Sequence, residues 1–167
     1  SWNFGTALLH EFDLWNREGV FTFDAYRSFF ENQLVVDLDQ SAREIHFYAL
    51  NGMSYSNSAQ AEINYDINRR VSVRTAYRFL DVKTDYQAGL LEKPFVSKHR
   101  GFLNMAYSTR KNKGKQWVMD LTTQFIGSQR IPFTRDNADR FILDERSPNY
   151  VLMNGQITRQ MSKETSI

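Results

Sequence analysis

The sequence predicts an all-β fold built around an antiparallel sheet, on three observations. Residues 55–83 alternate apolar and polar side chains on both sides of a tight turn, and a period of two is typical of strands. The connections between the expected strands alternate between short and long. Aromatic residues gather near the strand ends, and no amphipathic helix of useful length interrupts the pattern. We therefore expect strands with one apolar face and one polar face.

The first half of the chain supplies four expected strands. The first covers residues 2–14, and a turn at 16–19 leads to a second strand that starts at Phe21 and runs on through 34–36. After a turn at 37–41, a long third strand covers 45–67, with a bulge at Asn51–Gly52. A three-residue loop at 68–70 leads to a fourth strand over 71–83. One shared apolar face requires Ile67 to lie opposite Val71 in this hairpin.

The second half supplies the remaining strands and two long loops. Strands are expected over 101–107, 117–125 and 151–157, and an eighth strand begins within 163–167. The connections at 15–19, 68–70, 110–115 and 161–164 are short, whereas those at 85–98 and 128–148 are long. We expect the chain to be part of a longer protein.

The composition excludes several classes of protein. The 167 residues are 41% hydrophobic with a mean hydropathy of −0.55, and the apolar runs fall far short of the roughly 20 residues of a spanning helix. A net charge of +2 gives no electrostatic footprint for nucleic acid. The absence of cysteine excludes a disulfide framework and a thiolate metal site. No nucleophile elbow, phosphate loop or paired-carboxylate motif occurs, so we expect neither an enzyme nor a cofactor.

The apolar face is expected to contact lipid. Short turns on one side of a sheet and long loops on the other are typical of outer-membrane barrels. Two rows of aromatic residues border the expected apolar band, which would be about 25 Å tall. Near the short turns lie Phe12, Trp15, Tyr65, Tyr107 and Trp117; about ten residues further along lie Phe29, Tyr55, Phe79 and Phe125. The expected fold is a transmembrane antiparallel β-barrel fragment of about seven to eight strands.

Five short segments carry a resemblance to a known family. They are residues 57–58 with Glu62 and Tyr65, YRFLDVK at 77–83, Pro94 with KHR at 98–100, QFIGS at 124–128, and residues 147–148 with Tyr150 and Asn154. Their order on alternating strands resembles the C-terminal half of TonB-dependent outer-membrane receptors, especially those of Bacteroidetes-type bacteria. The resemblance covers about residues 55–158.

The resemblance implies a larger, about 22-stranded barrel closed by an N-terminal plug domain. Residues 1–167 would be a partial barrel domain without the plug and without the final strand or strands. It also implies a bacterial outer-membrane location, a scarce nutrient as ligand (an iron chelate, haem, cobalamin or similar), and energy from the inner-membrane TonB complex acting through the plug.

One polar constellation stands out on the expected lumen side. The register places Glu62 opposite Ala76 and diagonal to Arg74 and Arg78, so that one carboxylate lies between two guanidiniums. This arrangement is either a structural network in the barrel wall or an anion site on the substrate path, and the structural network is the commoner case. Asp120 and Gln124 are expected on the same face.

The long loops supply the other candidates for ligand contact, since loops on rigid scaffolds often carry function. They are Tyr86, Lys93, Phe95, Arg130, Arg135, Arg140 and Phe141. No histidine has a metal-ligand spacing, and the acids of 136–145 lack the regular spacing and glycine of a calcium loop. We expect no metal site there.

Two alternatives to the receptor stay open. One is a passive porin or a small structural barrel of the outer membrane. The other is a soluble β-barrel or sandwich that binds a small apolar ligand. The soluble model places Ile63, Val73, Leu103, Met119 and Leu121 inside a protein core and Arg74, Arg78 and Asp120 in water.

Overall fold

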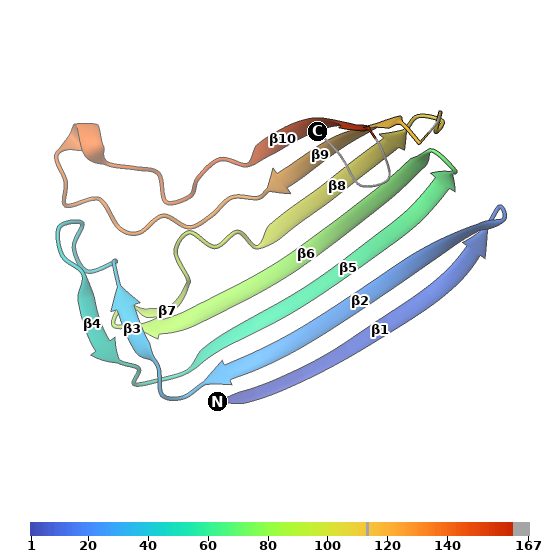
Figure 1. Cartoon of the computed structure of the whole chain (residues 1–167). Helices are drawn as coiled ribbons and strands as arrows, with labels where there is room; N and C mark the ends of the chain where they lie inside the picture. The colour runs from blue at the N-terminus through green and yellow to red at the C-terminus, as the bar shows by residue number, and fades with distance from the viewer. Residues whose placement is uncertain (113, 162–167) are drawn as a thin grey trace.

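The computed structural model describes residues 1–112 and 114–161, and it is all-β (Figure 1). One antiparallel sheet of eight strands follows the order β1-β2-β5-β6-β8-β9-β10, with the short β7 beside β6, and β3 and β4 form a separate pair. The strands are β1 (Trp2–Leu14), β2 (Arg17–Phe30), β3 (Leu34–Asp37), β4 (His46–Ala49), β5 (Ser54–Asn68), β6 (Val71–Tyr86), β7 (Gly89–Glu92), β8 (His99–Ser108), β9 (Gln116–Ile126) and β10 (Tyr150–Gln160). A short 3-10 helix, η1 (Asp139–Phe141), lies in the last long loop. The expected all-β class is confirmed.

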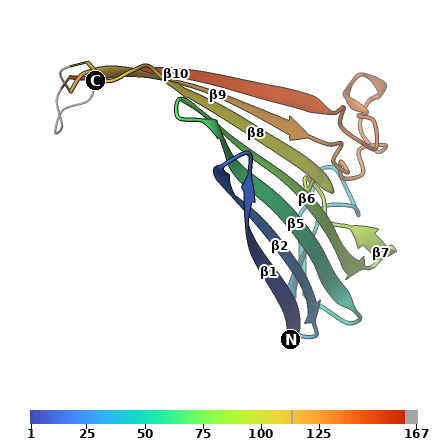
Figure 2. The same cartoon turned by 90° about the vertical axis from the view of Figure 1, so that its right-hand side faces the viewer.

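The large sheet is open and strongly curved (Figure 2). Its edge strands β1 and β10 do not pair with one another, and the sheet bends between them like part of a cylinder wall. Short turns lie at one end of the strands and the long connections at the other (Figure 1). None of the helical structure within the described ranges has the length and apolarity to span a membrane. The eighth strand expected within 163–167 lies outside the described residues.

The hairpin of β5 and β6 has the expected register along most of its length. Glu62 lies opposite Ala76, as the alternation predicts. The end of the hairpin differs, because the register shifts between Asp66 and Asn68 and places Asn68, rather than Ile67, opposite Val71. The Asn68 side chain causes this closure: its Oδ1 accepts hydrogen bonds from the backbone N–H groups of residues 70 and 71, at 2.8 and 3.1 Å. The turn therefore has two residues and a bulge at Ile67.

The first hairpin turns earlier than the sequence pattern predicts. Leu14 pairs with Arg17, so the turn consists of Trp15 and Asn16 alone and not of residues 16–19. Both turn residues have positive φ, 52° and 59°. Such a two-residue turn follows the twist of the flanking strands, and this explains why β2 begins directly after it.

The segment 31–53 does not continue the second and third strands, and this corrects the expected long strands through 34–36 and 45–67. Instead, β3 and β4 pair with each other, Leu34 opposite Ala49. Val35 and Leu50 pack with Tyr86 in a small buried core, which gives this hairpin its own hydrophobic contacts. β4 ends at Ala49 and β5 begins at Ser54, so Asn51 and Gly52 lie in a break between two strands and not in a bulge of one continuous strand. Gly52 lies against the Asp85 side chain, where a Cβ would collide.

Replacing Gly19 by valine is expected to lower the free energy of unfolding by about 1–3 kcal/mol, because overpacking forces neighbouring groups apart. Gly19 pairs with Phe12, and a Cβ at position 19 would overlap the Phe12 ring. Urea unfolding measures the loss. Gly155→Val is the matched control, since nothing lies within 4 Å of a Cβ at position 155. An equal loss in both variants would contradict the packing explanation.

Candidate functional site

The apolar face of the sheet contacts no other part of the described chain. From Leu103 to Tyr107 on β8 and from Trp117 to Leu121 on β9, every second side chain is apolar and exposed, and the side chains between them are less exposed. Met119 is 43% exposed and Leu121 is 45% exposed. The buried hydrophobic residues within residues 1–112 and 114–161 are Val35, Leu50, Tyr86 and Ile126. A sheet with this pattern is consistent with membrane strands, because its apolar side chains surround no protein core.

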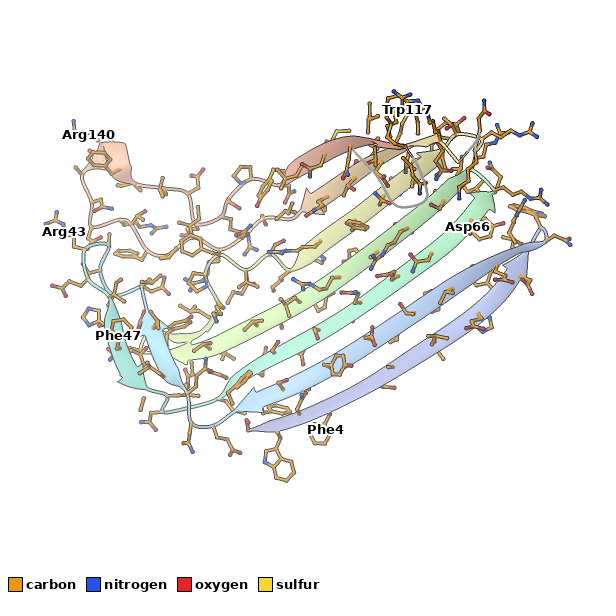
Figure 3. All side chains as sticks on the ribbon, viewed as in Figure 1. Phe4, Arg43, Phe47, Asp66, Trp117 and Arg140 are labelled. Atoms are coloured by element: carbon orange, nitrogen blue, oxygen red, sulfur yellow. The ribbon has the colours of Figure 1, made fainter. Side chains whose placement is uncertain are left out.

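Aromatic side chains border this face near the short turns. The rings of Phe12 and Tyr65 stack with centroids 6.1 Å apart, and the Tyr65 hydroxyl donates to the Leu14 carbonyl at 2.8 Å. The Arg159 guanidinium lies 5.1 Å from the centroid of the Trp117 ring, at the end of the strands that carries the turns (Figure 3). Trp15 occupies the first turn, and Tyr107 lies near the end of β8. All five interfacial candidates therefore lie at the same end of the sheet.

The polar face holds a cavity of about 330 Å³ across β5, β6, β8 and β9. Four of the five lumen candidates line it: Glu62, Arg74, Arg78 and Gln124. Asp120 lies on the same strand as Gln124 but does not line the cavity. We call this cavity the polar pocket; its lining is Gln60, Glu62, Arg74, Ala76, Arg78, Arg100, Gly101, Phe102, Gln124, Phe125 and Ile126.

Glu62 and Arg74 form a two-pronged ion pair within the polar pocket. Arg74 Nε donates to Glu62 Oε1 at 2.9 Å, and Arg74 Nη2 donates to Glu62 Oε2 at 3.1 Å. The Asn64 amide adds a third hydrogen bond to Oε1 at 2.8 Å. The structure therefore contains the expected contact between Glu62 and Arg74, and both carboxylate oxygens of Glu62 accept hydrogen bonds.

Arg78 does not complete the expected arrangement of one carboxylate between two guanidiniums. It makes no hydrogen bond or ion pair with Glu62, and it lies opposite Gln60 on β5 and opposite Arg100 on β8. Arg100 is a pocket residue that the alternation did not single out. The register of β6 with β8 decides its position, and the sequence carries no signal for that register across the long connection 87–98.

The opposite end of the sheet carries a cluster of loops, formed by residues 31–53, 87–98 and 127–149, which we call the loop cluster. Its central contact joins Arg130 to Asp39 through two hydrogen bonds of 2.7 and 2.8 Å. The side chains are 15% and 6% exposed. Arg130 Nε also donates to the Glu92 carbonyl, and the backbone N–H of Phe133 donates to Asp39 Oδ1 at 3.1 Å. One partly buried ion pair therefore connects all three segments.

The charged groups of the loop cluster are paired with groups of opposite charge, Arg130 with Asp39 and Glu92 with Lys98 and Arg146. Burial alone would lower the pKa of the Arg130 guanidinium, but the hydrogen bonds and charge of Asp39 outweigh it and raise the pKa. Burial alone would likewise raise the pKa of Glu92, but hydrogen bonds from Lys98 and Arg146 lower it below its ordinary value. Both groups therefore stay charged at neutral pH in the loop cluster.

The loop candidates fall into two groups. Tyr86 is buried in the small core and Arg130 is held by Asp39, so both have structural contacts. Arg135 pairs with Glu145 at 2.5 Å on the surface, and Arg140 lies over the neighbouring Phe141 ring at 4.7 Å. Lys93 and Phe95 are exposed on the connection before β8. Figure 3 shows Arg140 and Arg43 at the outer end of the loop cluster.

The acids of 136–145 are spread over separate contacts. Asp136 accepts hydrogen bonds from the Ser41 hydroxyl and the Ala42 backbone N–H, and Glu145 pairs with Arg135. Within residues 1–112 and 114–161, no three His, Cys, Asp or Glu side chains gather as metal ligands would.

Comparison of the chain with protein-family models, with curated proteins and with solved structures found no match.

Proposed function

We propose that the chain forms part of the wall of a transmembrane β-barrel in a bacterial outer membrane. The observation that carries this proposal is the apolar face, which no other part of the described chain covers and which aromatic residues border. The short turns at one end of the strands and the long connections at the other support it (Figure 1). Backbone groups at an open sheet edge in lipid would lack hydrogen-bond partners, each at a cost of several kcal/mol. Further strands beside β1 and β10 would remove these edges. The exposure of Ile63, Leu103, Met119 and Leu121 favours this proposal over the soluble alternative, which requires them in a core.

Within this proposal the barrel belongs to a TonB-dependent receptor that imports a scarce nutrient. The support is the family resemblance over residues 55–158, together with a lumen-facing pocket rich in hydrogen-bond donors. The coding sequence upstream distinguishes the receptor from a passive porin. A plug domain and a TonB-interacting segment are expected there; a complete barrel without a plug would contradict import driven from the inner membrane.

Spin labels are expected to report lipid contact at positions 63 and 121 and water contact at position 122. The chain has no cysteine, so a single introduced cysteine carries each label. Oxygen, which concentrates in lipid, should relax the labels at 63 and 121 more strongly than a water-soluble nickel chelate does. The label at 122 is the matched control, because Thr122 lies on the polar face of the same strand. Labels at 63 and 121 that are shielded from oxygen would contradict the membrane proposal.

A further inference from the structure

Two arginines face one another in the polar pocket without a partner. Arg78 on β6 lies directly opposite Arg100 on β8, and directly opposed residues have Cβ atoms about 4.5–5.5 Å apart. Like charges in this position are destabilising by themselves. Among the described residues, neither guanidinium makes a hydrogen bond or an ion pair, although Arg74 in the same pocket makes both. Two positive charges therefore meet here with no carboxylate at ion-pair distance among the described residues.

The polar pocket supplies further donors and no free carboxylate, while Asp24 lines a neighbouring depression with Arg78 and forms no ion pair with it. Three guanidiniums and one carboxylate line the pocket, and Arg74 and Asn64 already occupy the oxygens of Glu62. The carboxamides of Gln60 and Gln124 also line it and make no hydrogen bond within the described ranges. Phe102 and Ile126 contribute apolar surface. The pocket thus offers charged and neutral donors beside an apolar wall, in a volume of about 330 Å³.

We infer that Arg78 and Arg100 together bind the oxyanion group, carboxylate or phosphate, of a small organic molecule whose apolar part packs against Phe102. A guanidinium presents its donors in a planar fork that matches two oxygens of such a group. Two forks on adjacent strands reach one doubly charged anion from two sides. The inference rests on the proposed function, in which the polar face lines the lumen, and it assigns an anionic class of substrate to that lumen.

The test is a titration of the intact protein in a neutral detergent with three probes of similar size: phthalate, phenyl phosphate and neutral benzamide. Calorimetry is expected to detect binding of at least one anion and no binding of benzamide. The tighter of the two anions identifies the oxyanion. Rising salt should weaken the binding, because exposed charges are screened. Failure of both anions to bind, or equal binding of benzamide, would overturn the inference.

Substitutions assign the binding to the pair. Arg78→Gln combined with Arg100→Gln is expected to weaken anion binding by about tenfold or more, since hydrogen bonds to charged groups are lost. Arg78→Lys with Arg100→Lys keeps the charge and removes the fork, and it should show a smaller loss. If the glutamine variant does not fold, the loss of anion binding in this lysine variant tests the assignment instead. Unchanged binding in a folded double variant would overturn the assignment.

Arg27→Gln is the matched control, because Arg27 lies on the other face of the sheet, 4.6 Å from the Phe29 ring centroid. It removes one positive charge from the same sheet and should leave anion binding unchanged. The lipid-access measurement at position 121 separates this inference from the proposed function. A protein with lipid contact at 121 and no anion binding would retain the barrel proposal and lose the anion site.

Discussion

Replacing Leu121 by arginine is expected to lower the free energy of unfolding of the membrane-inserted protein by about 2–4 kcal/mol, the range for a charge near the middle of the bilayer. Leu121 lies midway between Trp117 and Phe125 along β9, and its side chain is 45% exposed on the apolar face. In an aqueous environment an exposed leucine tolerates arginine with little cost, so the large loss depends on lipid. Urea unfolding from lipid vesicles measures it.

Thr122→Arg is the matched control for this substitution. Residue 122 is the next position on β9 and lies on the polar face, beside the Asn104 amide that donates to its hydroxyl at 2.8 Å. This variant loses one hydrogen bond and places its charge on the polar side of the sheet, so its loss should be well below that of Leu121→Arg. Similar losses for the two variants would mean that the two faces meet the same solvent, and the membrane proposal would fail.

Replacing Asp39 by alanine is expected to release the loop cluster, at a cost of about 3–5 kcal/mol, while the large sheet stays folded. The substitution leaves the largely covered Arg130 guanidinium without its anion, and removing one partner of such a pair is the costly case. It also removes the acceptor of the Phe133 backbone N–H. Hydrogen exchange should accelerate at the amide of Phe95, which donates to the Arg130 carbonyl of another segment, and at that of Ile131, which donates to the Glu145 carbonyl within its own segment. The amides of β5 and β6 should keep their protection.

Glu145→Ala is the control for the loop prediction. Glu145 and its partner Arg135 are 79% and 67% exposed, so their ion pair is worth about 0–1 kcal/mol at most. The exchange of the same amides should change little. If Asp39→Ala were as mild as Glu145→Ala, the Arg130–Asp39 pair would not be what joins the three segments.

Much of the sheet could be predicted because strand alternation is a local property. β1, β2 and the β5–β6 hairpin follow directly from which side chains are apolar. The prediction was wrong where two short apolar stretches suited either a long strand or a separate hairpin. Residues 34–36 and 46–49 alternate correctly for both, and the core of Val35, Leu50 and Tyr86 selects the hairpin.

In the candidate site, too, contacts across a short turn could be predicted and contacts between distant segments could not. The alternation alone placed Glu62 near Arg74 on one face, since a short turn connects their strands. It did not place Arg100 opposite Arg78, because 21 residues separate these positions and a long connection leaves the register open. Nor did it pair Arg130 with Asp39 across 91 positions.

The sequence by itself determined that the chain forms strands with one apolar and one polar face, because the side chains of a strand alternate whatever the strand packs against. Only the tertiary structure decided which strands are neighbours, at which register, and which loops meet. Those choices depend on contacts between distant residues, whose energies appear only when the segments are brought together. The unpartnered arginine pair in the polar pocket is a product of that second set of choices.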